Sequence, residues 1–177
     1  MISISPSRGC ASALALLLLT AGCTSTRELM RDVSRKMGRT PAIEAPKSDP
    51  ELKPAVRLVL QSVQGTIRFP FGVTSVYAAG HNRMRPHLTR ARKAIESALL
   101  LLPEDRKIVI VGHSDPVGGP YSAFYHGAAR AHSVRNYLVA RGLPRDRLVA
   151  MTAGASDLRN KDDVRALENH RITFSVK

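Results

Sequence analysis

The chain has 177 residues and carries 27 Lys and Arg against 14 Asp and Glu, a formal net charge of +13. This length allows one domain with a hydrophobic core plus a tether. The charge indicates an anionic partner, although the basic residues are spread along the sequence and could form only a solvated surface. The N-terminal segment, described next, indicates export. We therefore exclude nucleic acid and expect anionic envelope polymers or lipid headgroups as partners.

Residues 1–22 have the features of a secretory signal peptide. Arg8 supplies the only early charge, and the apolar run from Cys10 to Leu19 is too short to span a bilayer. The following Leu19-Thr-Ala-Gly-Cys23 resembles a bacterial lipobox, whose Cys is lipidated and becomes the first mature residue, with Thr20 at the position usually held by Leu. The alternative is an ordinary cleaved signal with a Cys at 23 by chance.

Cys23 is the only cysteine left once the signal is removed, because Cys10 lies inside it. No disulfide can then form within the mature chain, and lipidation explains the odd thiol. By resemblance to such lipoproteins, Thr24 after the Cys favours the outer membrane, with the domain facing the periplasm.

Residues 23–54 have the composition of a tether. Ser25 and Glu28 fit a capping box that opens a short basic helix to about Met37, which could rest on the membrane surface or serve as a spacer. Residues 40–54 are rich in Pro and charge and read as a semi-extended linker, so the globular domain is expected at 55–177.

Within 55–177 the hydrophobic periodicity changes several times between strand and helix patterns. The expected elements are a strand or short helix at 56–63, strands at 66–71, 108–111, 148–151 and 171–176, helices at 86–102 and 122–141, and a brief helical stretch around 164–167. This order predicts an α/β fold, a two-layer sandwich with helices packed on one side of a mixed sheet.

A polar group follows the strand at 108–111, which is β-branched throughout and is expected at the centre of the sheet. His113, Ser114 and Asp115 lie at its C-terminal end, and Arg130 lies about two turns into the next helix, with its side chain leaning back toward that end. An acid and a guanidinium would meet at the rim of the sheet, outside the core. They suit a zwitterion with an amine and a carboxylate, or form a structural salt bridge.

Several ordered motifs together resemble the OmpA-like peptidoglycan-binding domains, a family that includes the peptidoglycan-associated lipoproteins. The motifs are Val111-Gly-His-Ser-Asp115 with Gly118, Ala129-Arg-Ala-His-Ser-Val134 with Tyr137-Leu138, Gly142 to Leu148, and Asn169 to Ile172. The resemblance covers roughly residues 65–177. It implies an OmpA-like βαβαβ-β domain that binds peptidoglycan without covalent linkage and tethers the envelope to the wall.

In that family, the residue matching Asp115 takes the free amine of diaminopimelate in the peptidoglycan stem, and the residue matching Arg130 takes its carboxylate. Arg171 matches an Arg placed near the same pocket, and Ser114 is grouped with them.

The chain also departs from the family pattern. It has Ala123 in place of an Asn, His126-Gly127 in place of Leu-Ser, and His170 as the first of a closing Arg pair. These departures leave the affinity open and keep a second function alive, a component of an envelope-spanning secretion or motility machine with a weakened wall site.

An enzyme is not expected. His113, Ser114 and Asp115 cannot form a triad by themselves, because neighbouring strand residues point to opposite faces. His113 and Asp115 could share a face as metal ligands, but no second ligand cluster accompanies them, so neither a metal nor a cofactor is predicted.

Overall fold

The computed structural model describes residues 52–78 and 81–177. The predicted signal peptide, the lipidation at Cys23, the basic helix and the linker up to residue 51 lie outside the described residues. Among the residues that are described, no helix combines the length and the apolar character needed to cross a membrane.

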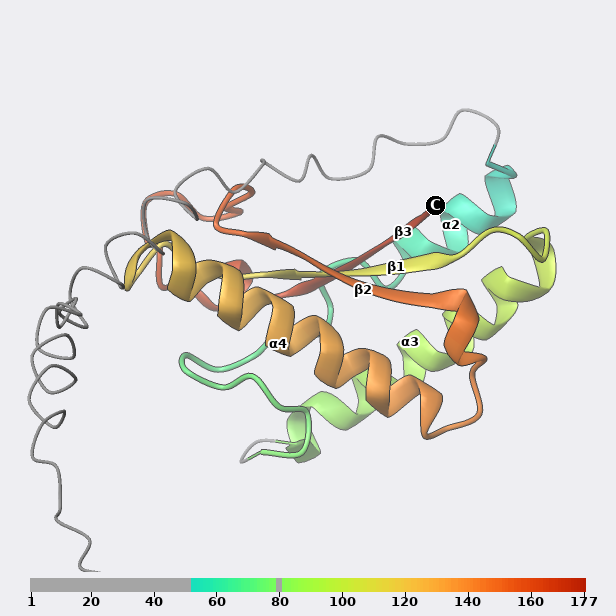
Figure 1. The fold of residues 1–177 in the computed structure, drawn as a ribbon, viewed down its shortest axis with the longest axis horizontal. Coiled ribbons are helices and arrows are strands. Elements are labelled where there is room, and N and C mark those ends of the chain that lie inside the picture. Colours follow the sequence, from blue (N-terminus) through green and yellow to red (C-terminus); the bar gives the residue numbers. More distant parts are fainter. Residues whose placement is uncertain (1–51, 79–80) are drawn as a thin grey trace, which may run out of the picture. The chain divides into compact units, whose positions relative to one another are not determined.

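A three-stranded mixed sheet forms the centre of the domain (Figure 1). Strand β1 (Ile108–His113) lies between β2 (Leu148–Gly154), which runs parallel to it, and β3 (Ile172–Val176), which runs antiparallel. Every residue of β1 is buried, as expected for a β-branched run at the centre of a sheet. The predicted α/β class and mixed sheet are therefore confirmed.

The helices supply the second layer. Helix α4 (Gly119–Val139) packs across β1 and β2, while α2 (Pro54–Gln61) packs against α3 (His81–Leu101). One continuous core joins all three helices to the sheet, and it includes Val56, Leu60, Leu88, Ile95, Ile110, Val134, Leu138, Ile172 and Phe174.

Helix α4 touches the sheet backbone to backbone. A Cβ on Gly112 would lie 1.9 Å from the Gly127 carbonyl oxygen, and one on Gly127 would lie 2.2 Å from Oγ1 of Thr152. Neither position can hold a side chain without moving the helix. Gly127, one of the departures from the family pattern, thus allows the closest approach of α4 to β1.

Two predicted helix boundaries were wrong. The helix expected from Pro86 begins at His81, so Pro86 lies inside α3. Met84, only 4% exposed, extends the buried stripe one turn earlier, and this burial outweighs the backbone donor that Pro86 lacks. Helix α4 begins at Gly119 instead of Ser122, directly after Gly118, whose φ of 84° lets the chain turn into the helix.

The short elements also differ in part from the sequence prediction. The ambiguous run at 56–63 is helical (α2). The predicted strand at 66–71 makes only one bridge, between Arg68 and Arg171, since Pro70 has no N–H to extend the ladder. The stretch around 164–167 contributes only a 3-10 turn, Leu167–Asn169. The remaining strands at 148–151 and 171–176 are confirmed as β2 and β3.

Candidate functional site

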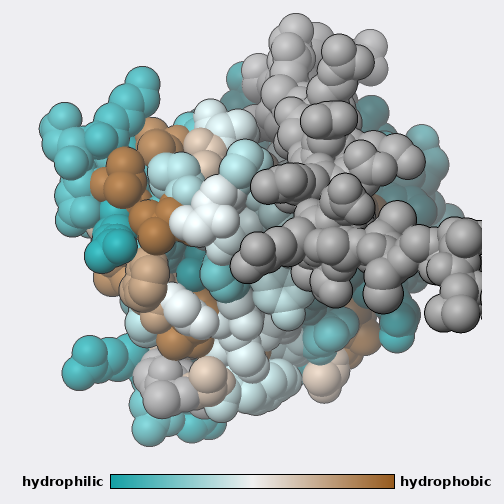
Figure 2. Space-filling view, turned by 60° about the vertical axis from the view of Figure 1, so that its left-hand side comes forward, coloured by the Kyte–Doolittle hydropathy of each residue, from teal (hydrophilic) through white to brown (hydrophobic). Residues whose placement is uncertain are grey.

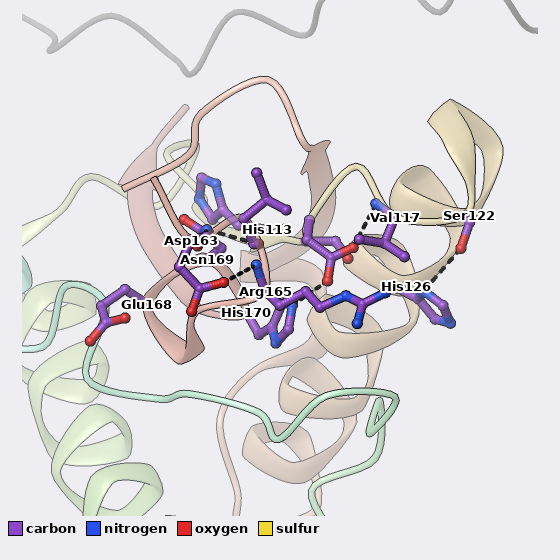
Figure 3. Close-up of polar contacts among 12 residues, drawn as sticks. His113, Val117, Ser122, His126, Asp163, Arg165, Glu168, Asn169 and His170 are labelled. Carbon is purple, nitrogen blue, oxygen red and sulfur yellow. Dashed lines mark hydrogen bonds and ion pairs between the residues drawn. The ribbon is translucent and has the colours of Figure 1, made fainter. Parts of the chain in front are cut away.

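The carboxylate of Asp115 is fixed at the end of β1, where the chain leaves the sheet for α4. Its Oδ1 accepts a hydrogen bond of 2.8 Å from the backbone N–H of Val117, and its Oδ2 lies 2.7 Å from Nε2 of His170; Figure 3 labels both of these partners. With 4% of its surface exposed, Asp115 is almost buried. Both oxygens are oriented by these bonds, and each keeps a lone pair for a further donor.

Arg130 projects from α4 into the same region. Its Nε donates to the Val73 carbonyl (2.9 Å), and its Nη1 donates to the His113 carbonyl (3.1 Å) and to Oγ of Ser114 (3.3 Å). The guanidinium carbon lies 5.6 Å from the centre of the Phe69 ring. Its Nη2 makes no hydrogen bond to any described residue, which leaves its N–H groups for an outside acceptor.

Arg130 lies in the interior rather than outside the core, so that prediction was wrong. It is 1% exposed and is among the largest fully buried side chains. Burial lowers the pKa of Arg130 to about 10, and the charge of Asp115 opposes this shift. The two backbone carbonyls and the Ser114 hydroxyl compensate the desolvated cation, which explains why it can lie here.

Asp115 and Arg130 do not form the structural salt bridge that was the alternative prediction. In the described part of the chain, Asp115 bonds to the side chain of His170, and Arg130 bonds to neutral acceptors. The two charges are nevertheless close, because Arg130 bonds to Ser114, the residue before Asp115, and Asp115 counters part of the lowering of the pKa of Arg130. We call Ser114, Asp115, Arg130 and His170 the Asp115 cluster.

His170 is the residue of the Asp115 cluster that the sequence did not predict as part of the site. It is 1% exposed, and its ring lies 5.8 Å from that of Phe71. The pKa of His170 is lowered, mainly by burial and to a lesser degree by the charges of Arg130 and His126. The hydrogen bond and the charge of Asp115 oppose this lowering. The only sequence signal was that His170 replaces an Arg of the family pattern.

Arg171 belongs to a second group, the Asp157 cluster, with His113, Asp157 and Thr173. Nη2 of Arg171 lies 2.6 Å from Oδ2 of Asp157, and Nη1 donates to the Asp157 carbonyl (3.0 Å). Nε2 of His113 lies 2.8 Å from Oγ1 of Thr173, and its Nδ1 lies 3.7 Å from Oδ2 of Asp157. The ligand-binding role predicted for Arg171 therefore stays a prediction.

The two clusters lie on opposite faces of the sheet. Gly112 faces α4 and Ile172 joins the core, so the neighbouring His113 and Arg171 project from the other face. His113 is therefore separated from Asp115, although the sequence left open that the two share a face as metal ligands, and no group of three or more potential metal ligands occurs among the described residues.

Side chains from α4 and from two loops lie near His170. On α4, Oγ of Ser122 lies 3.3 Å from Nδ1 of His126, and His126 is close enough to add to the lowering of the pKa of His170. The ring of Phe71 contacts His170, and the guanidinium carbon of Arg165 lies 5.6 Å from the centre of that exposed Phe71 ring; in Figure 3 Arg165 extends toward the α4 side. Ala123 is buried and adds no polar atom.

Asn169 fixes the loop that carries Arg165 and leads to His170. Fully buried, it accepts hydrogen bonds from the backbone N–H groups of Arg159 and Asn160 and donates to three carbonyls of the same loop. This side chain thus replaces the backbone pairing that a regular element would supply.

A sequence model described as the OmpA family matches residues 77–171, which is more than half of the chain. The chain belongs to the OmpA family. Within it, outer membrane protein A of Serratia odorifera is 28% identical over 110 residues, which cover 62% of this chain and 45% of that protein. The chain thus spans less than half the length of this OmpA relative.

Two solved structures resemble this chain over part of its length. The peptidoglycan-associated lipoprotein from Burkholderia pseudomallei has a TM-score of 0.49 and 21% identity, over 63% of this chain and 88% of that one. The periplasmic domain of Helicobacter pylori MotB has a TM-score of 0.47 and 22% identity, over 63% and 72% of the two chains.

Proposed function

We propose that this protein binds peptidoglycan non-covalently through the diaminopimelate of the stem peptide. The carrying observation is that Asp115 and Arg130 lie close together where β1 ends, with Ser114 next to Asp115 in the chain and hydrogen-bonded to Arg130, in a chain of the OmpA family. Asp115 has oriented oxygens with lone pairs left for an ammonium group, and Nη2 of Arg130 has N–H groups left for a carboxylate. The hydroxyl of Ser114 helps to orient the guanidinium of Arg130.

The ligand class follows from this pair of charges. Diaminopimelate adds an amine and a carboxylate at one end of its side chain, whereas lysine lacks that carboxylate and would leave Nη2 of Arg130 unpaired. Co-sedimentation with purified sacculi should therefore favour the diaminopimelate type over the lysine type. Equal retention on both, abolished by moderate salt, would point to non-specific attraction by the net positive charge.

The sharpest test of the site is Asp115→Asn, which keeps the shape and the acceptor for Val117 but removes the charge. Loss of a partly desolvated charged contact should weaken wall binding by about 2 kcal/mol, near thirtyfold. The matched control is Asp105→Asn, which changes an exposed acid before the opposite end of β1 and should bind like the parent. Parent-like retention of the Asp115 variant would contradict the proposal.

We place the protein at the outer membrane, anchored by a lipid on Cys23 and facing the periplasm. This rests on the lipobox-like run and the single mature thiol. Cys23→Ser should move the protein to the soluble periplasmic fraction and slow its processing. If membrane fractionation were unchanged, the anchor would have to be something else.

The second candidate function is a structural component of an envelope-spanning machine with a weakened wall site. The buried, apolar Ala123 and the contact of His170 with Asp115 favour it, because both reduce the polar groups free to meet a ligand. Absence of specific sacculus binding by the parent, with the fold intact, would support this alternative.

A further inference from the structure

His170 holds one of the two carboxylate oxygens of Asp115, yet the pair is not a salt bridge between two permanent charges. The bond joins Nε2 to Oδ2 at 2.7 Å, and both residues are nearly buried. When His170 is neutral, Nε2–H donates one hydrogen bond and the carboxylate keeps its full negative charge. When His170 is protonated, a positive charge lies directly against Asp115.

The surroundings favour the neutral form. Nδ1 of His170 is buried without a hydrogen-bond partner, so protonation would create a buried N–H with no acceptor. The charged and titratable groups that face His170 are Asp115 after β1, Arg130 and His126 on α4, and Arg165 across the Phe71 ring. Only Asp115 among them attracts a positive charge.

We propose that His170 is a specificity-determining residue that sets the affinity of the site for the ligand's ammonium group. Neutral His170 fixes the Asp115 carboxylate and leaves its charge available, whereas protonated His170 cancels that charge. This inference rests on the proposed binding of diaminopimelate. A permanently charged side chain at position 170 could not act in this way.

The ammonium group and the proton on His170 then compete. Neutralising Asp115 removes a charge–charge attraction at close range, so ligand affinity should fall roughly tenfold when His170 becomes protonated. By thermodynamic reciprocity, the bound ligand must in turn lower the pKa of His170. A purely structural His170 would show neither effect.

The test is retention of the full mature protein on diaminopimelate-type sacculi between about pH 7.5 and about pH 5, a range over which an ordinary carboxylate stays mostly ionised and a histidine titrates. Parent binding should fall as the pH is lowered, following the midpoint of His170 measured by NMR. His170→Gln keeps an amide donor for Asp115 but cannot titrate, so it should bind at the higher pH and lose the pH dependence.

Two controls isolate His170. His126→Gln removes the other nearby histidine ring, which makes no hydrogen bond to Asp115, and should keep the parent's pH dependence. Sacculi whose free amines have been acetylated should bind weakly and without this dependence, because no ammonium group remains. If His170→Gln does not fold, the role of His170 is decided by its pKa in the parent, measured by NMR with and without free meso-diaminopimelate.

The outcomes separate this inference from the proposed function. Specific binding at the higher pH that does not change on acidification, or that changes equally in His170→Gln, overturns the role of His170 and leaves peptidoglycan binding standing. A pH dependence that disappears with His126→Gln also overturns it. No specific binding at any pH, with Asp115→Asn like the parent, overturns both.

Discussion

The Asp115 cluster and the Asp157 cluster contain the same three kinds of side chain, an acid, a histidine and an arginine, but they combine them differently. In the Asp157 cluster the acid side chain is 55% exposed and pairs directly with the buried Arg171. In the Asp115 cluster the acid is buried, its partner is a histidine, and the arginine is held by carbonyls. Direct pairing uses up the charges of Asp157 and Arg171, whereas separate partners keep the charges of Asp115 and Arg130 available for a ligand.

The largest expected effect comes from removing Arg130, and removing Arg171 is the matched comparison. Arg130→Met would strand the Val73 and His113 carbonyls in the interior and should lower the free energy of unfolding by about 3 kcal/mol. Arg171→Met leaves a half-exposed Asp157 that water can solvate, and should cost about 1–2 kcal/mol. Urea denaturation measures the unfolding free energy of both variants. Equal losses of stability would contradict the difference between the two clusters. Binding by Arg130 variants must therefore be corrected for the folded fraction.

A smaller effect is expected from pH, through the Asp157 cluster. Burial, with help from Arg171, lowers the pKa of His113 to about 4, while the unfolded value is near 6.5. Between these two pH values the unfolded chain binds more protons than the folded one. The contribution of His113 to the free energy of unfolding is therefore complete above about pH 6.5 and is lost on acidification toward pH 4. The loss should be on the order of 2–3 kcal/mol.

The variant His113→Gln isolates this contribution. It should flatten most of the dependence of the unfolding free energy on pH, and His170, whose pKa is also lowered, should account for part of the remainder. An unchanged slope in the variant would show that His113 is not the group responsible.

The smallest effect is expected for Asp157→Asn. The amide oxygen can still accept from Arg171, and the side chain at position 157 is 55% exposed and solvated by water, so stability should fall by at most about 1 kcal/mol. Wall binding should not change, in contrast to Asp115→Asn. A loss of wall binding comparable to that of Asp115→Asn would mean that the Asp157 cluster, with Arg171, also meets the ligand.

The sequence predicts well the strand and the helix that hold this site, because each depends on a local pattern of residues. The β-branched run of β1 and the stripe of Gly127, Ala131, Val134 and Leu138 on α4 are each encoded within one element. The burial of Arg130 had a readable signal, since it lies one turn after Gly127 on the same buried side of the helix. A polar residue on that side was expected to reach out of the core.

Contacts between distant segments were not predictable in the same way. His170 and Asp115 are 55 positions apart, and their hydrogen bond depends on the route of the loop that Asn169 organises. Likewise, the segment around Arg68 is extended as predicted, but its pairing is limited to one bridge by Pro70 and by the turn that follows it. Propensity specifies the conformation of such segments, not their partners.

The contact between Gly112 and Gly127 has a mechanical consequence. Asp115 follows the central strand, and Arg130 lies one turn beyond Gly127 on the helix pressed against that strand. Tension applied through a ligand held by both residues would therefore act on β1 and α4 together. Since β1 is hydrogen-bonded to β2 on one side and β3 on the other, such a load must shear two ladders at once, instead of peeling away one edge strand.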